Sequence, residues 1–365
     1  MTRQKQFLTY IAYLQIIGIF LVVFGHSFHE YPDDCNGHSL LIYRLFYSFR
    51  MPLFLFVSGF LMIHSIKRTA ILSVHKFFKL KVKRLIIPLA FLCIITFIPR
   101  CILSSMADDA IDLSWHSLIR GLIFGNELII PFFWFLQTSF LLLTFCYGFI
   151  SLFHRFHINP KLIFSALFLF FIGLYLLPFR LPDLFSVNQV QRLGIYFVAG
   201  ACYGWYNTYI DTRINFASPI TGVAFCILWI SLFFIFENSE FIVFCSAAGI
   251  CMCISVAKLL EKRGNRLLDL FVGANYMIFL LSWYCNVFSQ QILHHYFDFP
   301  WWIFTILSLC SGILVPWFLY QLMLMTKTSR LTKIIAFCLG QSLSKTSVLH
   351  LNNDKKTSSC CKQIV

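Results

Sequence analysis

Charge is scarce in this sequence. Only 12% of its 365 residues are Asp, Glu, Lys or Arg, whereas a soluble domain would carry roughly 25%. Hydrophobic residues make up 59% of the chain, including 44 Phe, and the mean hydropathy is +0.77. A buried soluble core does not need this many continuous apolar runs, so the composition excludes an ordinary soluble protein. It indicates a membrane protein with many spanning segments.

Acidic residues are the scarcer kind of charge, with 15 Asp and Glu against 29 Lys and Arg and a net charge of +14. In a soluble protein this excess would suggest a nucleic-acid partner. In a membrane protein the simpler explanation is that cations collect in cytoplasmic loops and fix the orientation. We therefore expect membrane lipids, and no nucleic acid, as partners.

Several motifs are also missing. The 14 Cys contain no CxxC pair, and many lie inside apolar runs, where they behave as small hydrophobic residues. The chain has no Gly-rich phosphate loop and no HExxH, GxSxG or DxD pattern. We expect no metal. Cys360 and Cys361 are either lipid-modified or without a role, and the sequence does not decide between these.

The apolar runs predict an all-α, polytopic helix bundle. A spanning helix needs about 20 apolar residues, and this rule gives about ten spans. They lie near 11–28, 46–64, 86–104, 132–152, 162–178, 190–206, 216–236, 241–257, 268–288 and 301–324.

The distribution of charge supports this count. With both termini cytoplasmic, the inner segments hold about 23 of the 29 cations and about 4 of the 15 anions. Residues 1–326 are then one transmembrane domain, and 327–365 are a basic, polar cytoplasmic tail that we expect to be disordered. The basic inner loop near 65–85 is either an interfacial helix on anionic lipid or a docking surface for an anionic cofactor.

His26 is the first candidate site residue, because an ionisable group at the margin of a spanning segment costs free energy. If the helix continues, His26, His29, Glu30 and Asp33 share one helical face. A carboxylate one turn away can orient an imidazole as a general base. The alternative is a histidine that only bonds a neighbouring helix. Gln15 lies about 16 Å below His26 on the same face.

Arg50 is the second candidate. It precedes Met51 and Pro52, and Pro52 suits the first turn of a helix. Its guanidinium could pair with Glu30 or Asp33, or bind an anion or oxyanion in a site.

Four further candidates lie later in the chain. The run KLKVKRLIIPL contains Lys81 and Arg84, which either anchor a helix end or bind the phosphates of a nucleotide-bearing cofactor. Trp134 opens the fourth predicted span, where aromatic belts lie. Arg192 opens the sixth and is followed by glycines typical of close helix packing.

Taken in order, five segments resemble the acyltransferase-3 family of bacterial integral-membrane acyltransferases. They are GIFLVVFGH ending at His26, SFRMPLFLFVSGFL from 48 to 61, KVKRLIIP from 81 to 88, FWFLQ from 133 to 137, and RLGIYFVAG from 192 to 200. The resemblance covers the first four spans strongly and the rest by hydropathy and spacing.

The resemblance implies a ten-helix inner-membrane enzyme that moves an acyl group, usually acetyl, from cytoplasmic acyl-CoA to a hydroxyl of an extracytoplasmic glycan. His26 matches the family's first-helix histidine, and Arg50 the position before Met-Pro. Lys81 and Arg84 match a basic pair on the donor side, and Trp134 matches the tryptophan of a WFL motif. The chain departs from its relatives at Gln15, where they usually carry Arg or Lys, with an acidic residue upstream where this chain has Tyr13. Their ninth-span histidine is also missing, and Trp283 lies near its place.

We therefore expect an O-acyltransferase that acts on a surface polysaccharide or its lipid-linked precursor. The expected catalytic residues are His26, Arg50 and Glu30. The expected acyl-CoA contacts are Lys81, Arg84 and Gln15, and the acceptor contacts are Asp33, Trp134 and Arg192. Two alternatives remain: a transporter or flippase for a lipid-linked or anionic solute, and a catalytically inactive relative.

Overall fold

The chain folds almost entirely into helices. The computed structural model describes residues 3–28, 37–69, 72–103, 115–127, 130–237, 239–297, 299–341 and 343. Within those ranges the strand pairing is confined to one β-bridge, between Phe124 and Leu184. The all-helical prediction is confirmed for this part of the chain.

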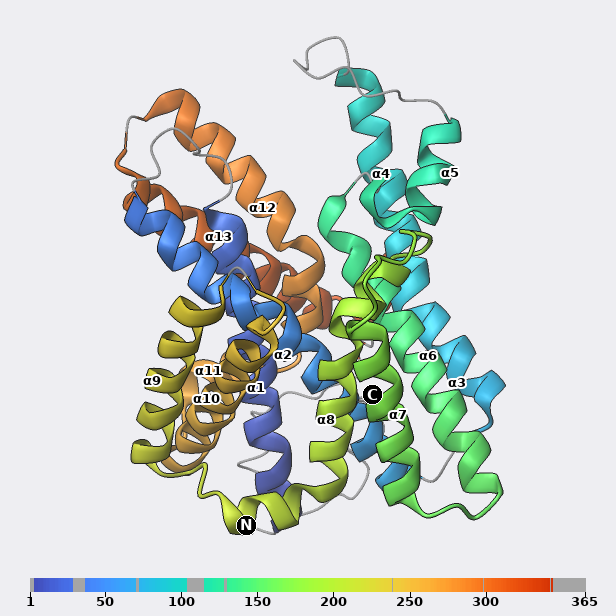
Figure 1. Cartoon of the computed structure of the whole chain (residues 1–365). Helices are drawn as coiled ribbons and strands as arrows, with labels where there is room; N and C mark the ends of the chain where they lie inside the picture. Colours follow the sequence, from blue (N-terminus) through green and yellow to red (C-terminus); the bar gives the residue numbers. More distant parts are fainter. Residues whose placement is uncertain are drawn as a thin grey trace. The chain divides into compact units, whose positions relative to one another are not determined.

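The helices follow one another with mostly short connections (Figure 1). In order they are α1 Arg3–Ser27, α2 Gly37–Thr69, α3 Val74–Lys81, the π-helical turn η1 Val82–Ile86, α4 Ile87–Leu103, α5 Trp115–Ile123, the 3-10 turns η3 Gly125–Glu127 and η4 Pro131–Phe133, α6 Trp134–Arg155, α7 Pro160–Tyr175, α8 Val187–Arg213, α9 Pro219–Phe236, α10 Ile242–Arg263, α11 Arg266–Phe271, α12 Asn275–Tyr296, α13 Trp301–Met325 and α14 Arg330–Cys338.

Six helical segments of the described chain are long and apolar enough to cross a membrane. They are Thr9–Ser27, Leu40–Lys67, Trp134–Arg155, Pro219–Phe236, Ile242–Arg263 and Trp301–Met325. The other four predicted spans coincide largely with α4, α7, α8 and α12. Of these, α4 and α7 have only 17 and 16 residues, and α8 and α12 are long but less apolar. The structure thus supports a multi-pass membrane protein without establishing ten spans.

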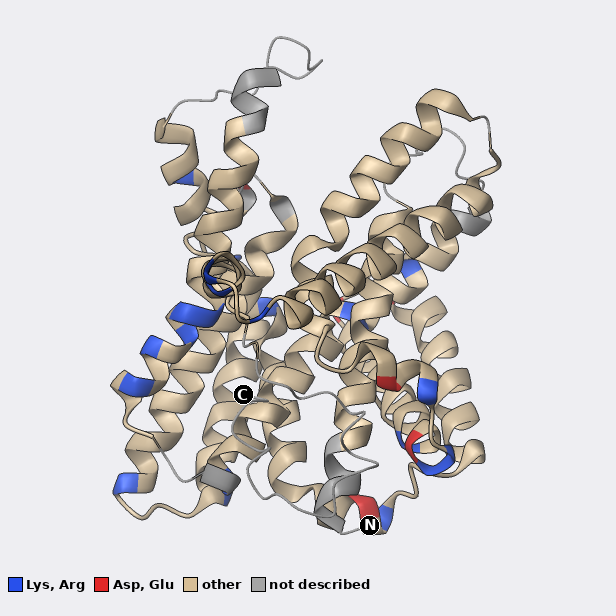
Figure 2. Ribbon diagram, turned by 180° about the vertical axis from the view of Figure 1, so that it is seen from behind, with Lys and Arg blue, Asp and Glu red and all other residues tan. Residues whose placement is uncertain are grey.

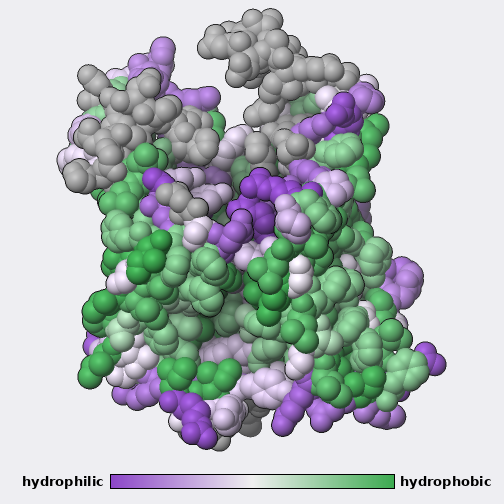
Figure 3. Space-filling view, viewed as in Figure 1, coloured by the Kyte–Doolittle hydropathy of each residue, from purple (hydrophilic) through white to green (hydrophobic). Residues whose placement is uncertain are grey.

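The helix α9 shows how such a segment meets the bilayer. Only 11% of its apolar window is buried inside the protein, and Ile220, Phe234 and Ile235 are among its exposed side chains. Figure 3 shows hydrophobic side chains gathered on the surface in this region. In water this exposure would be costly, whereas lipid chains can cover it.

The chain divides into two compact units. The first comprises Met1–Val57, Asn207–Thr332 and Leu343–Ile364. In it α9 packs along α10, α12 packs along α13, and α1 contacts α10, α12 and α13 (Figure 1). The second unit comprises Ser58–Tyr206, Lys333–Ser342 and Val365.

Within the second unit, the end of α2 crosses α8 at close range. A side chain at Gly59 would overlap the Phe197 carbonyl, and a Cβ at Gly204 would lie 3.1 Å from a backbone oxygen of α2. Small residues at a crossing let two backbones approach. The ammonium of Lys67 donates to the carbonyls of Gly204 and Trp205, at 3.0 and 2.7 Å, and so links the end of α2 to α8.

The basic segment of the second unit is a helix that continues without interruption from α3 through η1 into α4. Lys and Arg residues, blue in Figure 2, follow one another along α3 and η1. Phe77 of α3 stacks on Tyr147 of α6, with ring centroids 3.6 Å apart. The Tyr147 hydroxyl donates to the carbonyl of Leu72 at 3.1 Å. This part of the inner loop therefore packs against a spanning helix.

The prediction of a disordered tail from residue 327 is wrong for residues 330–338, which form α14. Hydrophobic residues at helical spacing explain the helix, because Ala336 and Leu339 are buried while Leu331 and Phe337 lie on the exposed side. Gly340 then turns the chain in a left-handed conformation with φ of 60°. Residues 344–365 lie outside the described residues.

Candidate functional site

The helix α1 carries His26 in its last turn and ends at Ser27. The Ser27 hydroxyl donates to the Val23 carbonyl at 2.9 Å, a bond that competes with helix propagation. The described helix ends at Ser27 and a turn follows at Phe28, so the condition for one shared helical face, a helix that continues past His26, is not met in the described residues. Glu30 and Asp33 themselves lie outside the described residues, and their assigned roles stay predictions.

The helix α2 places Arg50 farther into the span than the sequence suggested. It begins at Gly37, so Pro52 is an interior residue and not part of the first turn. Pro is tolerated within spanning helices, because neighbouring groups can satisfy the freed carbonyl. Arg50 is consequently ten residues inside the apolar segment Leu40–Lys67, where a charge is costly to bury.

Arg50 belongs to a stripe on α2 that also contains Tyr43 and Tyr47. Spacings of four and three residues place all three on one helical face. The guanidinium carbon lies 4.6 Å from the centroid of the Tyr47 ring and 5.3 Å from that of Tyr43. One guanidinium nitrogen also donates to the Tyr43 hydroxyl, at 3.5 Å. Both rings therefore make cation–π contacts with the guanidinium.

The other side of the guanidinium lies against α1 at Gly25, the residue before His26. A Cβ built on Gly25 would overlap Arg50 Nη1. Glycine lets the cation approach the backbone of α1 here, whereas a side chain at this position would displace the guanidinium. The structure brings Arg50 and the turn that carries His26 together, within the first unit of the chain.

This cation is buried, and no carboxylate of the described residues pairs with it. Arg50 is 6% exposed, and within the described part of the chain its charged and polar contacts are the two tyrosines. Its buried Nε has no hydrogen-bond partner there. Burying an uncompensated cation costs free energy. The arrangement therefore suits an anionic ligand or an oxygen that becomes negative during a reaction.

Lys81 and Arg84 lie in the second unit, at the junction of α3 and η1. Lys81 is only 7% exposed, and its ammonium lies 4.9 Å from the centroid of the Phe77 ring. Burial, with a smaller contribution from the nearby Arg84 charge, lowers the pKa of Lys81 to about 7. A π-helical turn at this pair is a feature that often accompanies functional sites.

The three remaining candidates lie apart from these clusters in the sequence and differ in exposure. Trp134 is the half-buried first residue of α6, and Arg192 is exposed on α8. Gln15 is half-buried on α1, eleven residues before His26. None of the contacts in the described chain assigns a role to these three residues.

Two residues near His26 escaped the sequence reasoning. Asn286 and Gln290 of α12 bond the last turn of α1. The ninth predicted span ended at residue 288, so Gln290 fell outside it. Two carboxamides one turn apart in an apolar helix are a detectable signal, because polar groups in a span need partners. Tyr43 and Tyr47 could have been found by their helical spacing to Arg50.

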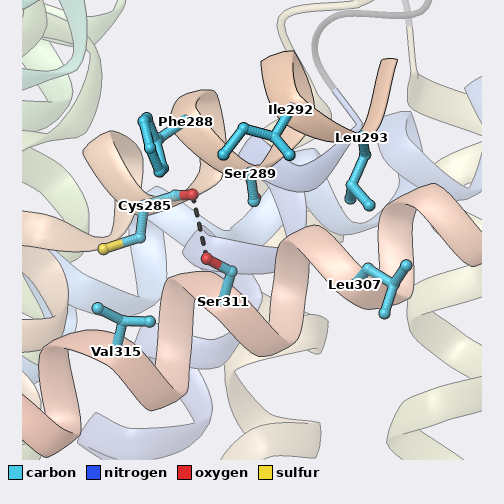
Figure 4. A pocket seen from close by; sticks show the side chains of 8 residues that line it. All are labelled: Cys285, Phe288, Ser289, Ile292, Leu293, Leu307, Ser311 and Val315. Carbon is cyan, nitrogen blue, oxygen red and sulfur yellow. Dashed lines mark hydrogen bonds between the residues drawn. The ribbon is translucent and has the colours of Figure 1, made fainter. Parts of the chain in front are cut away.

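A pocket of about 470 Å³ opens between α12 and α13, within the first unit (Figure 4). Phe288, Ile292 and Val315 are among the side chains that line it, and the Ser311 hydroxyl donates to the Cys285 carbonyl at 3.1 Å. Charged groups are absent from this lining. The pocket lacks the convergent polar groups of a catalytic site, so the cluster at Gly25, His26 and Arg50 remains the candidate.

These features define a helical membrane protein in which a buried arginine, without a carboxylate partner among the described residues, lies against the helical turn that carries a histidine. Comparison with protein families then shows that a family model described as "Acyltransferase domain" matches residues 8–321. The chain therefore belongs to the acyltransferase-3 family, as its sequence segments predicted, and this membership implies membrane acyltransferase activity. Comparisons with curated proteins and with solved structures found no match.

Proposed function

We propose that this protein is an O-acyltransferase of the bacterial inner membrane. Its acyl donor is cytoplasmic acyl-CoA, with acetyl as the favoured group. Its acceptor is a hydroxyl of an extracytoplasmic polysaccharide or lipid-linked glycan. The chain crosses the membrane ten times, with both termini in the cytoplasm.

Ion pairs support the proposed topology. Arg44 pairs with Glu237, both in segments assigned to the outer side by the charge distribution. Lys258 pairs with Asp211, both in segments assigned to the inner side. The two residues of an ion pair must lie on the same side of the membrane. If the number of spans predicted between them were wrong by one, they would lie on opposite sides.

In the proposed reaction neutral His26 acts as general base. It accepts the proton of the acceptor hydroxyl, and the hydroxyl oxygen attacks the thioester carbonyl carbon. Arg50 stabilises the negative oxygen of the tetrahedral intermediate. The carbon–sulfur bond then breaks, and protonated His26 returns its proton to the CoA sulfur. The products are the acylated acceptor and free CoA, and Glu30 keeps the predicted role of orienting the imidazole.

Lys81 and Arg84 are proposed to bind the phosphates of acyl-CoA. A buried ammonium with a lowered pKa gains a proton readily when a phosphate arrives. Gln15 is proposed to accept or donate a hydrogen bond to CoA, because it cannot supply the charge of the relatives' Arg or Lys. Asp33, Trp134 and Arg192 are proposed to contact the acceptor.

The observation that carries the proposal is the guanidinium of Arg50 against Gly25, buried and without a carboxylate among the described residues. A structural arginine would be expected to have an acidic partner. In a chain of this family, against the turn that carries His26, a buried cation whose described partners are two tyrosines fits the stabilisation of an oxyanion.

The experiment that tests the function follows the acyl group. Membranes containing the protein are incubated with acetyl-CoA labelled in its acetyl group, and the label in the glycan fraction and the free CoA are measured together. We expect equal molar amounts of transferred label and of free CoA, and neither in membranes that lack the protein. Movement of a glycan precursor across the membrane without CoA release would contradict the proposal and favour a transporter.

A further inference from the structure

Two carboxamides of α12 enter the last turn of α1, where His26 lies. Asn286 and Gln290 are four residues apart, so they share one face of α12. They are 0% and 3% exposed, respectively. This face differs from the one that lines the pocket of Figure 4.

Gln290 bonds the backbone of the histidine itself. Its Nε2 donates to the Ser27 carbonyl at 3.0 Å and to the His26 carbonyl at 3.4 Å. One turn away, Asn286 Nδ2 donates to the Val23 carbonyl at 3.3 Å and to the Ser27 hydroxyl at 3.4 Å. Four weak to moderate bonds therefore converge on three residues in the last turns of α1, Val23, His26 and Ser27.

These bonds satisfy backbone carbonyls at the end of α1. The last four carbonyls of an α-helix have no partner within the helix. In an apolar environment each unsatisfied carbonyl is costly, so a buried helix end requires donors from elsewhere. Gln290 supplies these donors at the point where α1 stops, and so fixes where its final turn lies.

The helix α13 packs against Asn286 and Val23. A Cβ built on Gly312 would overlap Asn286 Oδ1 and crowd Val23. Gly312 thus lets α13 approach the Asn286 amide closely. A glycine in the interior of a helix is otherwise unfavourable, so its presence here fits the need for this contact.

We infer that Gln290, supported by Asn286, is a positioning residue for His26. It holds the terminal turn of α1 so that the imidazole keeps one placement relative to the guanidinium at Gly25. The inference rests on the proposed role of His26 as general base. The alternative is a polar contact that only joins two spanning helices, and the two readings predict different outcomes.

The neighbouring residue provides a matched test. Gln290→Met removes the donor and keeps the length of the side chain, and Gln291→Met makes the same change at an exposed position of the same helix. We expect Gln290→Met to lower kcat about 10- to 100-fold with KM for acetyl-CoA changed less than about twofold, because misplacement affects the chemical step. Gln291→Met should behave as the wild type. A Gln290→Met enzyme with wild-type kcat would overturn the inference.

A second measurement does not depend on the activity. Purified protein is treated with diethyl pyrocarbonate, and the modification rate of each histidine is read by mass spectrometry. We expect Gln290→Met to raise the rate at His26 about three- to tenfold, as expected for the loss of about one net hydrogen bond, while His294 and His295 keep their rates. Unchanged reactivity of His26, or equal acceleration of all three histidines, would refute the positioning role. If His26→Ala retained full transfer, the proposed function would fail, but these rates would still decide the inference.

Discussion

Gly25→Ala is the substitution that tests the contact between α1 and Arg50 most sharply. The new methyl group would overlap Nη1 of the guanidinium, which must retreat by about 2 Å to reach ordinary contact distance. A misplacement of about 1 Å at a reacting centre can cost on the order of 100-fold in rate. We therefore expect kcat for acetyl transfer to fall at least about 100-fold, or about 2.7 kcal/mol in the activation free energy.

Gly18→Ala on the same helix is the matched control. Its methyl group would lie 3.4 Å from the Phe54 ring and 3.6 Å from the Leu53 side chain, which is ordinary contact. Both substitutions favour the helix by about 1 kcal/mol, so neither should reduce the amount of protein in the membrane. The assay is acetyl transfer per mole of inserted protein. Equal activity of the two variants would refute the reasoning about Arg50.

Three further predictions follow from the second unit. Because burial lowers the pKa of Lys81 to about 7, the ammonium that binds phosphate loses its proton as the pH rises, so KM for acetyl-CoA should rise about tenfold between pH 6 and 8. Lys81→Arg, which stays charged, should abolish this rise, and a parallel rise in that variant would count against the donor site. Deleting residues 344–365 should leave the protein intact. Deleting 330–365 also removes Ala336 of α14 and the adjacent Leu339, which are both buried. The lost burial should lower the free energy of unfolding by about 2 kcal/mol and so lower the melting temperature. Equal melting temperatures of the two deletion variants would contradict the packing of α14. Gln137→Leu should destabilise the second unit by about 2 kcal/mol, because the buried amide pairs with Ser186 and the Leu122 carbonyl, and an unchanged melting temperature would argue against that network.

Much of the fold could be predicted because each spanning helix corresponds to a long apolar run in the sequence. Helices occupy every one of the ten predicted spans, at least in part. Their lengths were harder to predict. The helix α2 begins at Gly37, nine residues before the predicted span. Polar residues do not end a helix by themselves, so the helix extends beyond the apolar run wherever backbone hydrogen bonds and packing permit. The same reason explains α12, whose last two turns lie beyond the predicted end at 288.

The charged residues of the site could be predicted from the sequence, but the residues that contact them could not. Arg50 and Lys81 could be singled out because charge is costly in a span or at its margin. Gly25 could not, because a glycine reveals its role only when a partner from another helix approaches it. Gln290 did offer a local signal, a second carboxamide one turn after Asn286, but its partners Ser27 and His26 could not be predicted from the sequence. Tertiary contacts of this kind leave no local pattern.

The assignment of α14 shows the limit of composition. Lys, Ser and Thr in the region after residue 327 suggested disorder. Four apolar side chains at helical spacing within 331–339 were enough to fold a short helix once they met the basic segment of the second unit. Lys83 lies 4.8 Å from the centroid of the Phe337 ring, and Gly340 lies close to the Arg84 backbone. Average composition over a long window concealed this local pattern.

Replacing His26 by alanine is the most direct test of the central claim that this chain transfers an acyl group. Wild-type and His26→Ala proteins are brought to equal amounts in membranes, and label from acetyl-CoA is followed into the glycan fraction together with free CoA. The account predicts protein-dependent transfer by the wild type and none by His26→Ala. Transfer by His26→Ala at the wild-type rate would contradict it.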